Sequence, residues 1–294
     1  MSDTRRAVAA LLLAALSFTG LAGCGQGTQH SNAPVLDVVT TIYPLAEAAR
    51  TIGGGNVKVV GAVPPGANPR TYQPSAADVD ALRQAKVIVD VGAGFQPGIE
   101  AAIPTGTAVV SLAPTAAVAD LGPWLDPTSM AQFGPRLAQA FTAANPGATA
   151  TYQTGARDYA SEMQSLQADF QSSLSDCPRD QIVTPDATAT LLARRHRIID
   201  HVVGAEATPT GDQLNRAVSV IRTSGVKAVF SQPWVPDGTI IAAAGAAGVP
   251  VKAFDTLEGP PPGGWPKGAT YQGLIEQDLG TLTSTLQCAQ MGQN

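Results

Sequence analysis

Strand-like runs alternate with helix-like segments along most of this 294-residue chain, and this alternation restricts the fold more than any other feature. A strand, a helix and a second strand in succession need a crossover connection, which produces a parallel sheet. The series occurs twice, before and after one long helical stretch. It predicts an α/β protein with two lobes, each a four-stranded, mainly parallel sheet with flanking helices. The predicted strands are 36–41, 57–63, 87–91 and 108–112, then 181–184, 198–203, 226–230 and 250–254.

The long helical stretch separates the two series of strands. Asn145 can cap a helix there and Pro146 can take its first position. From Tyr152 to Leu174, apolar residues recur at steps of three and four. We therefore predict a rigid helix of about 30 residues, or about 45 Å, that joins the lobes. A coiled-coil arm for dimerisation is the alternative interpretation. The predicted boundaries are 36–144 for the first lobe, 145–176 for the linking helix and 177–294 for the second lobe.

Residues 1–23 have the composition of an export signal. A pair of arginines precedes an apolar run, which is followed by Leu21-Ala22-Gly23-Cys24. This is the pattern of a bacterial lipoprotein signal, in which Cys24 becomes the lipid-bearing N-terminus. We expect a lipid-anchored protein on the extracytoplasmic face of the cell membrane, with residues 24–35 as a flexible tether that includes His30. A cleaved signal without a lipid is the alternative, and the apolar run is short for a membrane span.

Cys177 and Cys288 are the two cysteines that lipidation leaves. In an exported chain such a pair predicts one disulfide, with two free buried thiols as the alternative. The formal net charge of −5 and the lack of a Lys/Arg cluster give no basis for nucleic-acid binding. The chain has no Gly-x-Ser-x-Gly, His-Glu-x-x-His or phosphate-loop motif, so we expect no enzymatic activity.

A stiff loop follows the second predicted strand, and residues 64–74 read Pro-Pro-Gly-Ala-Asn-Pro-Arg-Thr-Tyr-Gln-Pro. Proline and glycine at this density end both strands and helices. Loops at the carboxyl ends of parallel strands are where open α/β sheets bind ligands. The loop resembles Pro-Pro-Gly-x-x-Pro-His-x-Tyr-x-Pro of the solute-binding lipoproteins of zinc and manganese ABC importers (cluster A-I, ZnuA/TroA-like).

Further segments resemble the same family. Residues 120–127, Asp-Leu-Gly-Pro-Trp-Leu-Asp-Pro, are similar to its Asp-Pro-His-x-Trp-Leu-Asp-Pro motif. Residues 92–97, 184–195 and 251–255 are similar to its loop after strand three, its third-histidine segment and its final ligand strand. The resemblance covers nearly the whole chain after the tether, and it implies the same two-lobed fold with little hinge movement.

The resemblance implies four metal-ligand positions, which are occupied here by Arg70, Gly122, Asp186 and Asp255. Arg70 has no lone pair to donate to a metal, and Gly122 has no side chain. Asp186 and Asp255 are therefore the ligands that the resemblance leaves for zinc or manganese. Two carboxylates alone are a weak site for a transition metal.

Arg70 also suggests a different arrangement, in which it lies between Asp186 and Asp255 and its charge replaces that of a metal. His196 and His201 are five residues apart on different predicted elements, so we expect structural or solvated roles for both. The remaining candidates are aromatic residues that either line a pocket for an organic solute or pack between the lobes, with packing favoured for Tyr72 and Trp124: Tyr43, Tyr72, Trp124 and Trp234.

The resemblance implies an extracytoplasmic solute-binding lipoprotein of a metal ABC importer, with an altered metal site. Such a protein would work as a monomer with a membrane permease and its cytoplasmic ATPase. One alternative is an accessory or partner-binding lipoprotein that keeps the fold and binds no metal. The other is a protein that binds another small solute, such as an anion held by Arg70 or a metal chelate.

Overall fold

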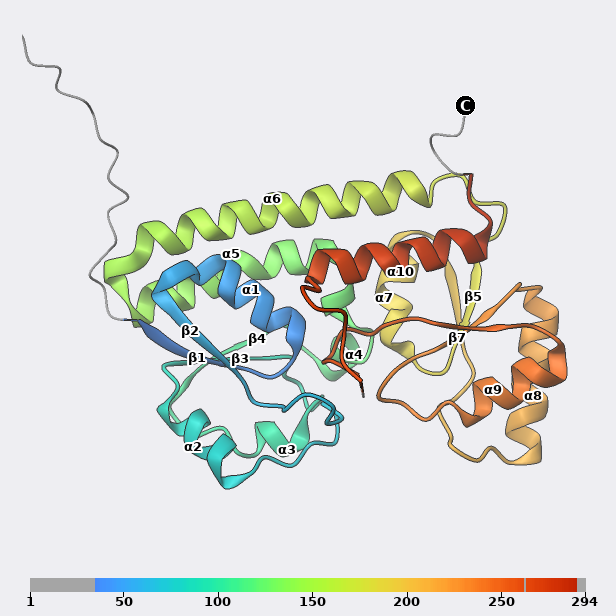
Figure 1. Ribbon diagram of the computed structural model, residues 1–294, viewed down its shortest axis with the longest axis horizontal. Coiled ribbons are helices and arrows are strands. Elements are labelled where there is room, and N and C mark those ends of the chain that lie inside the picture. The colour runs from blue at the N-terminus through green and yellow to red at the C-terminus, as the bar shows by residue number, and fades with distance from the viewer. Residues whose placement is uncertain (1–34, 262, 290–294) are drawn as a thin grey trace, which may run out of the picture. The chain divides into compact units, whose positions relative to one another are not determined.

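Four parallel strands in the order β2-β1-β3-β4 form the first sheet (Figure 1). The structure is a computed structural model that describes residues 35–261 and 263–289, all within one compact unit. The central strand β3 is buried along its whole length, whereas the edge strand β2 is mostly exposed or half-buried. This is the pattern of a parallel sheet with helices on both faces. The strands are β1 (Leu36–Thr40), β2 (Val57–Gly61), β3 (Val87–Asp90) and β4 (Ala108–Ser111).

Capping residues set the ends of several helices around this sheet. Ser75 and Asp78 form a reciprocal capping box at the start of α2. Gly54, with φ of 54°, ends α1. The helical segments are α1 (Tyr43–Gly53), η1 (Gly54–Asn56), α2 (Ala76–Gln84), α3 (Pro97–Glu100), α4 (Ala116–Ala119), η2 (Pro123–Leu125) and α5 (Pro127–Ala144).

Helix α5 was absent from the sequence-based prediction. Pro135 lies inside it, and a proline in a helical pattern normally marks a break, because it has no N–H to donate. Asp126 caps the helix and Pro127 takes its first position. The buried face of α5 packs against the long helix, so tertiary burial stabilises a helix that the local signal argues against.

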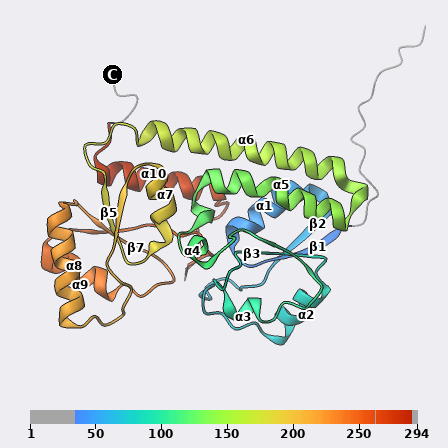
Figure 2. The ribbon, with the colours of Figure 1, turned by 180° about the vertical axis from the view of Figure 1, so that it is seen from behind.

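Helix α6 (Thr149–Ser173) is the predicted linking helix, preceded by the short η3 (Pro146–Ala148). Its apolar stripe is buried against α5, α1 and α10 (Tyr271–Leu286), which run beside it in Figures 1 and 2. The stripe is therefore used inside the molecule and not in a coiled-coil arm. The buried residues of α6 are Tyr152, Ala156, Tyr159, Met163, Leu166 and Phe170.

The four predicted strands of the second half are present, but they pair as two two-stranded parallel sheets and not as one four-stranded sheet. Strand β7 is three residues long and pairs with β8 on one side, which leaves few backbone groups for a ladder with the adjacent β5. The strands are β5 (Gln181–Thr184), β6 (Ile199–Val202), β7 (Val229–Ser231) and β8 (Val251–Ala253). The helical segments are η4 (Ala187–Ala189), α7 (Thr190–Arg195), α8 (Gly211–Ser224), α9 (Gly238–Ala247) and α10.

The two halves share their largest apolar core. It continues from Val38 in β1 through Trp124 to Phe254 after β8. The predicted disulfide between Cys177 and Cys288 is present and ties the segment after α6 to the end of α10. No helix among the described residues is long and apolar enough to cross a membrane. The predicted signal, Cys24 and His30 lie outside the described residues.

Candidate functional site

The loop after β2 carries Arg70 in a fixed backbone position. The backbone N–H of Arg70 donates to the Oδ1 atom of Asn68 at 3.0 Å. The buried side chain of Gln96 donates to the carbonyl of Pro69 at 3.0 Å and to that of Thr41 at 3.2 Å. The Gln96 amide therefore links the loop to the carboxyl end of β1, and the Arg70 side chain starts from a well-determined place.

The guanidinium of Arg70 joins the two halves of the protein. Its Nε lies 2.9 Å from Oε2 of Glu258, and its Nη2 lies 2.6 Å from Oε1 of the same carboxylate. Its Nη1 donates to Oδ2 of Asp186 at 2.6 Å. Its Nη2 also donates to the hydroxyl of Thr188 at 2.6 Å. Two-point contacts between a guanidinium and a carboxylate are among the strongest and most directional ion pairs in proteins.

An aromatic ring covers the guanidinium. The Cζ atom of Arg70 lies 5.2 Å from the centre of the Phe95 ring, within the range of a cation–π contact. Phe95 packs edge-to-face on the fully buried Trp124, with ring centres 4.8 Å apart. The preceding loop has positive φ angles at Gly92, Ala93 and Gly94. A non-glycine residue such as Ala93 adopts this conformation at a cost, and such residues concentrate at functional sites.

Burial and charge act in opposite directions in this ion pair. The Glu258 side chain has no exposed surface, and burial raises its pKa while the hydrogen bonds and charge of Arg70 lower it, with a net upward shift. For Arg70, burial lowers the pKa, but the hydrogen bonds and charge of Glu258, followed by those of Asp186, outweigh it and raise the pKa further. The guanidinium therefore stays charged and balances the Glu258 carboxylate.

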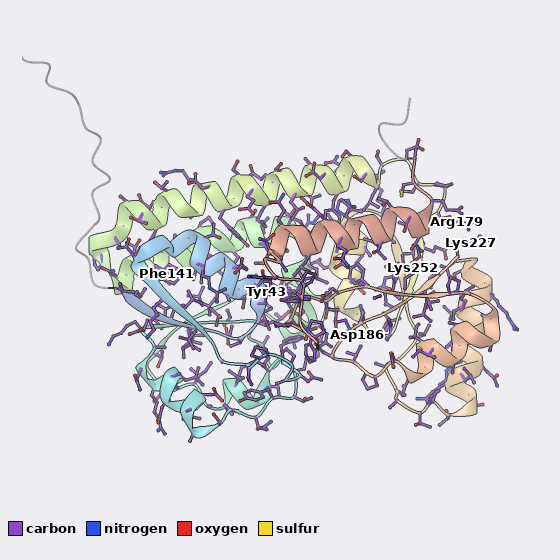
Figure 3. All side chains as sticks on the ribbon, viewed as in Figure 1. Tyr43, Phe141, Arg179, Asp186, Lys227 and Lys252 are labelled. Carbon is purple, nitrogen blue, oxygen red and sulfur yellow. A yellow bond between two sulfur atoms is a disulfide. The ribbon has the colours of Figure 1, made fainter. Side chains whose placement is uncertain are left out.

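Asp186 lies between the two halves of the protein (Figure 3) and pairs with Arg70, as the ion-pair hypothesis predicts. It caps η4, and its Oδ1 accepts from the backbone N–H of Thr188 at 3.0 Å. Its other oxygen meets Arg70. Each carboxylate oxygen of Asp186 thus has a donor, and the orientation of the side chain is set from two directions.

Asp255 does not face Arg70. The hypothesis that Arg70 lies between Asp186 and Asp255 is therefore wrong for Asp255. Oδ1 of Asp255 accepts from the backbone N–H of Leu257 at 2.8 Å, and Oδ2 accepts from Nε1 of Trp265. Glu258, three residues further along the same loop, takes the expected place. Sequence spacing alone does not distinguish two acidic residues in one loop, because the turn after β8 decides which of them faces the site.

Gly122 lies where the second family ligand is expected, and its surroundings are filled. It has φ of 65°, and a Cβ atom built on it would lie 2.0 Å from the carbonyl oxygen of Thr188. The nearby N–H of Leu191 donates to the carbonyl of Leu121 at 3.2 Å. The second half of the protein therefore packs its backbone into the space that a side chain at position 122 would need.

The residues present do not fit a zinc or manganese ion while Arg70 is in place. The described residues contain no group of three or more His, Cys, Asp or Glu side chains arranged to hold a metal. Asp186 and Glu258 already accept from Arg70. The histidines are elsewhere: Nε2 of His201 lies 2.8 Å from Oε1 of Gln181, and His196 packs on Phe170, where burial lowers its pKa.

The aromatic candidates mostly have packing or positioning roles. Trp124 is fully buried, and its Nε1 donates to the carbonyl of Thr256 at 2.7 Å. The hydroxyl of Tyr72 donates to Asp78 at 2.7 Å. The carbonyl of Trp234 accepts from Asn68 at 2.8 Å, which adds a further hydrogen bond between the halves.

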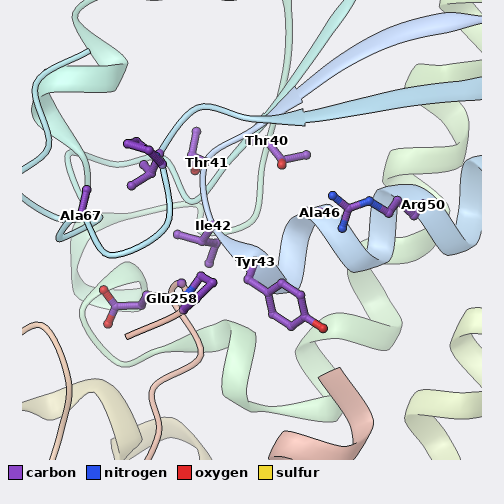
Figure 4. Close-up of a pocket in the computed structure, with 13 residues that line it drawn as sticks. Thr40, Thr41, Ile42, Tyr43, Ala46, Arg50, Ala67 and Glu258 are labelled. Atoms are coloured by element: carbon purple, nitrogen blue, oxygen red, sulfur yellow. The ribbon is translucent and has the colours of Figure 1, made fainter. Parts of the chain in front are cut away.

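Tyr43 lines a cavity of about 120 Å³ beside Glu258 (Figure 4). The hydroxyls of Thr40 and Thr41, which also line it, are buried and have no hydrogen-bond partner among the described residues. Pockets for organic ligands usually measure about 300–1,000 Å³, so this cavity suits water better than an organic solute.

A family model described as "Zinc-uptake complex component A periplasmic" matches residues 38–285 of this chain. The chain belongs to this family. The iron-binding protein YfeA of Yersinia pestis is 25% identical over 250 residues, which cover 78% of this chain and 80% of that protein. The manganese ABC transporter substrate-binding lipoprotein scaA of Streptococcus gordonii is 22% identical over 270 residues, covering 83% and 87% of the two chains.

Solved structures of family members have the same fold. The crystal structure of ZnuA has a TM-score of 0.75 at 20% identity and covers 86% of this chain and 99% of its own. The laminin-binding protein Lmb of Streptococcus agalactiae has a TM-score of 0.75 at 21% identity, with coverage of 85% and 99%. The resemblance found in the sequence and the α/β fold class are thereby confirmed. Several relatives of this chain are named as metal or manganese ABC transporter substrate-binding lipoproteins.

Proposed function

We propose that this chain is the extracytoplasmic solute-binding subunit of an ABC importer of the zinc and manganese type, and that Arg70 closes its inherited cargo site. The family match over residues 38–285 supports the general function. The observation that carries the specific part is the Arg70 guanidinium, which holds Glu258, Asp186 and Thr188 at the same time. A metal cargo must displace Arg70 before it can reach these oxygen atoms.

The carboxylates available to such a cargo are Asp186 and Glu258. The expected pair of ligands, Asp186 and Asp255, has less support, because both oxygens of Asp255 accept hydrogen bonds from its own loop. Oxygen atoms alone suit a hard cation such as manganese better than zinc. Between zinc and manganese, we therefore expect manganese to compete better with Arg70.

The remaining parts of the proposal concern the cell. The chain would be anchored through a lipid on Cys24 at the extracytoplasmic face of the membrane. It would act as a monomer that delivers its solute to a permease driven by a cytoplasmic ATPase, and it would catalyse no reaction itself. The Leu-Ala-Gly-Cys sequence at 21–24 and the lipoprotein names of its relatives support this placement.

Calorimetric titration with manganese and zinc tests the proposal. The metal-stripped protein from residue 25 onward is compared with D186N, E258Q and D255N variants. We expect weak binding to the wild type, which is lost in D186N and E258Q and retained in D255N. Tight binding that only D255N abolishes would contradict the assignment of Glu258 and favour Asp255. Failure to form a complex with any co-expressed permease and ATPase would favour the accessory-protein alternative.

A further inference from the structure

We propose that the site between the two halves is a receptor for a guanidinium cation, and that Arg70 fills it as a tethered ligand. The inference goes beyond the proposed function, because it names a class of solute other than a metal that the same site recognises. It concerns recognition only and does not depend on whether a permease uses the protein.

The acceptors match the shape of a guanidinium group. Glu258 receives Nε–H and Nη2–H from one edge of the planar cation, at 2.9 Å and 2.6 Å. Asp186 receives Nη1–H, and the Thr188 hydroxyl receives a second hydrogen from Nη2. An ammonium group presents its three donors around a single point and does not span several acceptors spread around one plane.

The Phe95 ring adds recognition that a metal ion does not need. A planar, weakly hydrated guanidinium stacks well on an aromatic ring, whereas a divalent metal requires oxygen or nitrogen ligands on every side. The Cζ atom of Arg70 is 5.2 Å from the Phe95 ring centre. Phe95 contacts Trp124 edge-to-face, so its ring packs against the apolar core and is not a chance surface contact.

The receptor groups are held by contacts that do not involve Arg70. The backbone N–H of Thr188 fixes Asp186. The carbonyl of Glu258 accepts from the N–H of Tyr43 at 3.1 Å, which fixes the backbone of that residue. The receptor should therefore keep its arrangement when the Arg70 side chain is removed, and the vacated space should accept a free cation of the same shape.

The inference predicts the type of solute that competes with Arg70. It is an organic cation with a guanidinium or amidinium head, which fits these acceptors and the Phe95 ring better than a hydrated divalent metal does. It also explains how a family ligand position can hold arginine in a stable protein. The fixed positive charge satisfies Glu258, which is fully buried and would otherwise be unpaired.

Chemical rescue of the R70A variant tests the inference. Ethylguanidinium matches the part of the arginine side chain that alanine lacks, and ethylammonium is the control cation at equal ionic strength. The melting temperature of the full chain is measured with each cation at millimolar concentration. We expect ethylguanidinium to restore at least half of the Tm lost in R70A, while ethylammonium restores little. R70A/F95L should respond less, because the aromatic face is gone.

The matched control is R83A, which removes an arginine whose ion pair with Asp80 is exposed on both sides. Ethylguanidinium should not change the Tm of R83A or of the wild type. Equal rescue by both cations, no rescue of R70A, or greater stabilisation of R70A by manganese or zinc would each overturn the inference.

If R70A does not fold, R70K provides the test, since lysine keeps the positive charge and lacks the paired N–H donors of the planar guanidinium. We expect a clear loss of Tm in R70K, and a Tm equal to that of the wild type would show that charge alone suffices. Failure of the permease experiment leaves these results unaffected, so the two proposals fail separately.

Discussion

Arg70 and Glu258 are 188 residues apart in sequence, yet the Arg70 guanidinium donates hydrogen bonds to both carboxylate oxygens of Glu258. The Glu258 side chain is completely buried, whereas that of Arg70 retains 21% of its exposure. The carboxylate therefore depends on this single neighbour for charge compensation. This ion pair joins the loop after β2 in the first half of the protein to the loop after β8 in the second half.

Removal of the Arg70 side chain should lower the free energy of unfolding, and the loss should be smaller when Glu258 is neutralised as well. Breaking a buried ion pair from one side typically costs about 3–5 kcal/mol, because the other charge is left unpaired. We expect R70A to lose stability in this range at neutral pH, and R70A/E258Q to recover a large part of it. Urea unfolding of the two single variants and the double variant measures the coupling. A double variant whose loss equals the sum of the single losses would argue against the pair.

Histidine at position 70 should create metal affinity. R70H replaces a group without a lone pair by an imidazole beside Asp186 and Glu258, which provides three ligands of the kinds that zinc accepts. We expect zinc to bind R70H at least about tenfold more tightly than the wild type, or about 1.4 kcal/mol. Calorimetry on R70H, with R70Q and R70H/D186N as controls, makes the comparison. An R70Q variant that gains as much affinity would show that removal of the arginine, and not the imidazole, creates the site.

The second family ligand position should not accept a side chain. G122A must hold φ of 65°, which costs a non-glycine residue about 1–3 kcal/mol, and its Cβ would also collide with the carbonyl oxygen of Thr188. Gly225 is a matched control, because it has φ of 66° and no neighbour within 4 Å of a Cβ position. We expect G122A to be clearly less stable than G225A in urea. Equal losses would mean that the η4 backbone moves away easily.

Asp278 should make the protein less stable as the pH rises. It is buried, its Oδ1 accepts from the N–H of Asp255 at 3.0 Å, and its Oδ2 has no partner among the described residues. Burial, followed by the charge of Asp255, raises the pKa of Asp278 well above its ordinary value. The stabilising effect of the protonated form is complete below the unfolded-state pKa and is lost as the pH rises through the folded-state pKa.

The D278N variant tests this dependence, because an amide keeps an acceptor for Asp255 and does not ionise. Urea unfolding between about pH 4 and pH 8 should show a fall in stability for the wild type that is smaller in D278N. D180N, which changes an exposed aspartate, is the control. Parallel pH profiles for the wild type and D278N would contradict the prediction.

The Cys177–Cys288 disulfide should contribute substantially to stability. The bridge closes a loop between residues 111 positions apart, and the chain-entropy model gives about 4–5 kcal/mol for a loop of this length. We expect C177S/C288S to lose about 2–5 kcal/mol in urea unfolding, without a change in metal binding. Reduction of the wild type under native conditions should cause the same loss. A double variant as stable as the oxidised protein would show that the packing of α6 and α10 is sufficient.

Local patterns in the sequence were enough to predict most elements. Short apolar runs bounded by glycine and proline predicted the strands, because strand and turn chemistry act over a few residues. The long helix α6 followed from the same kind of signal. Helix α5 was missed, because Pro135 argues locally against a helix that burial stabilises.

The site was predicted in part. Arg70 and Asp186 were placed together from a resemblance in their loops, and the contact between them is present. Glu258 and Phe95 were missed as members of the site. Each lies in a loop with other suitable residues, and the turn after β8 and the positive φ angles at 92–94 decide which side chain faces Arg70.

The sequence by itself determined the family, the alternation of strands and helices, the pairing of two cysteines and the loss of the family histidine at position 70. These features depend on residue types and short-range spacing. Only the tertiary structure decided that Glu258 takes the carboxylate position beside Arg70, that Thr188 fills the space at Gly122 and that Phe95 covers the guanidinium. Those relationships join residues far apart in the chain, and packing and charge compensation across the two halves select them.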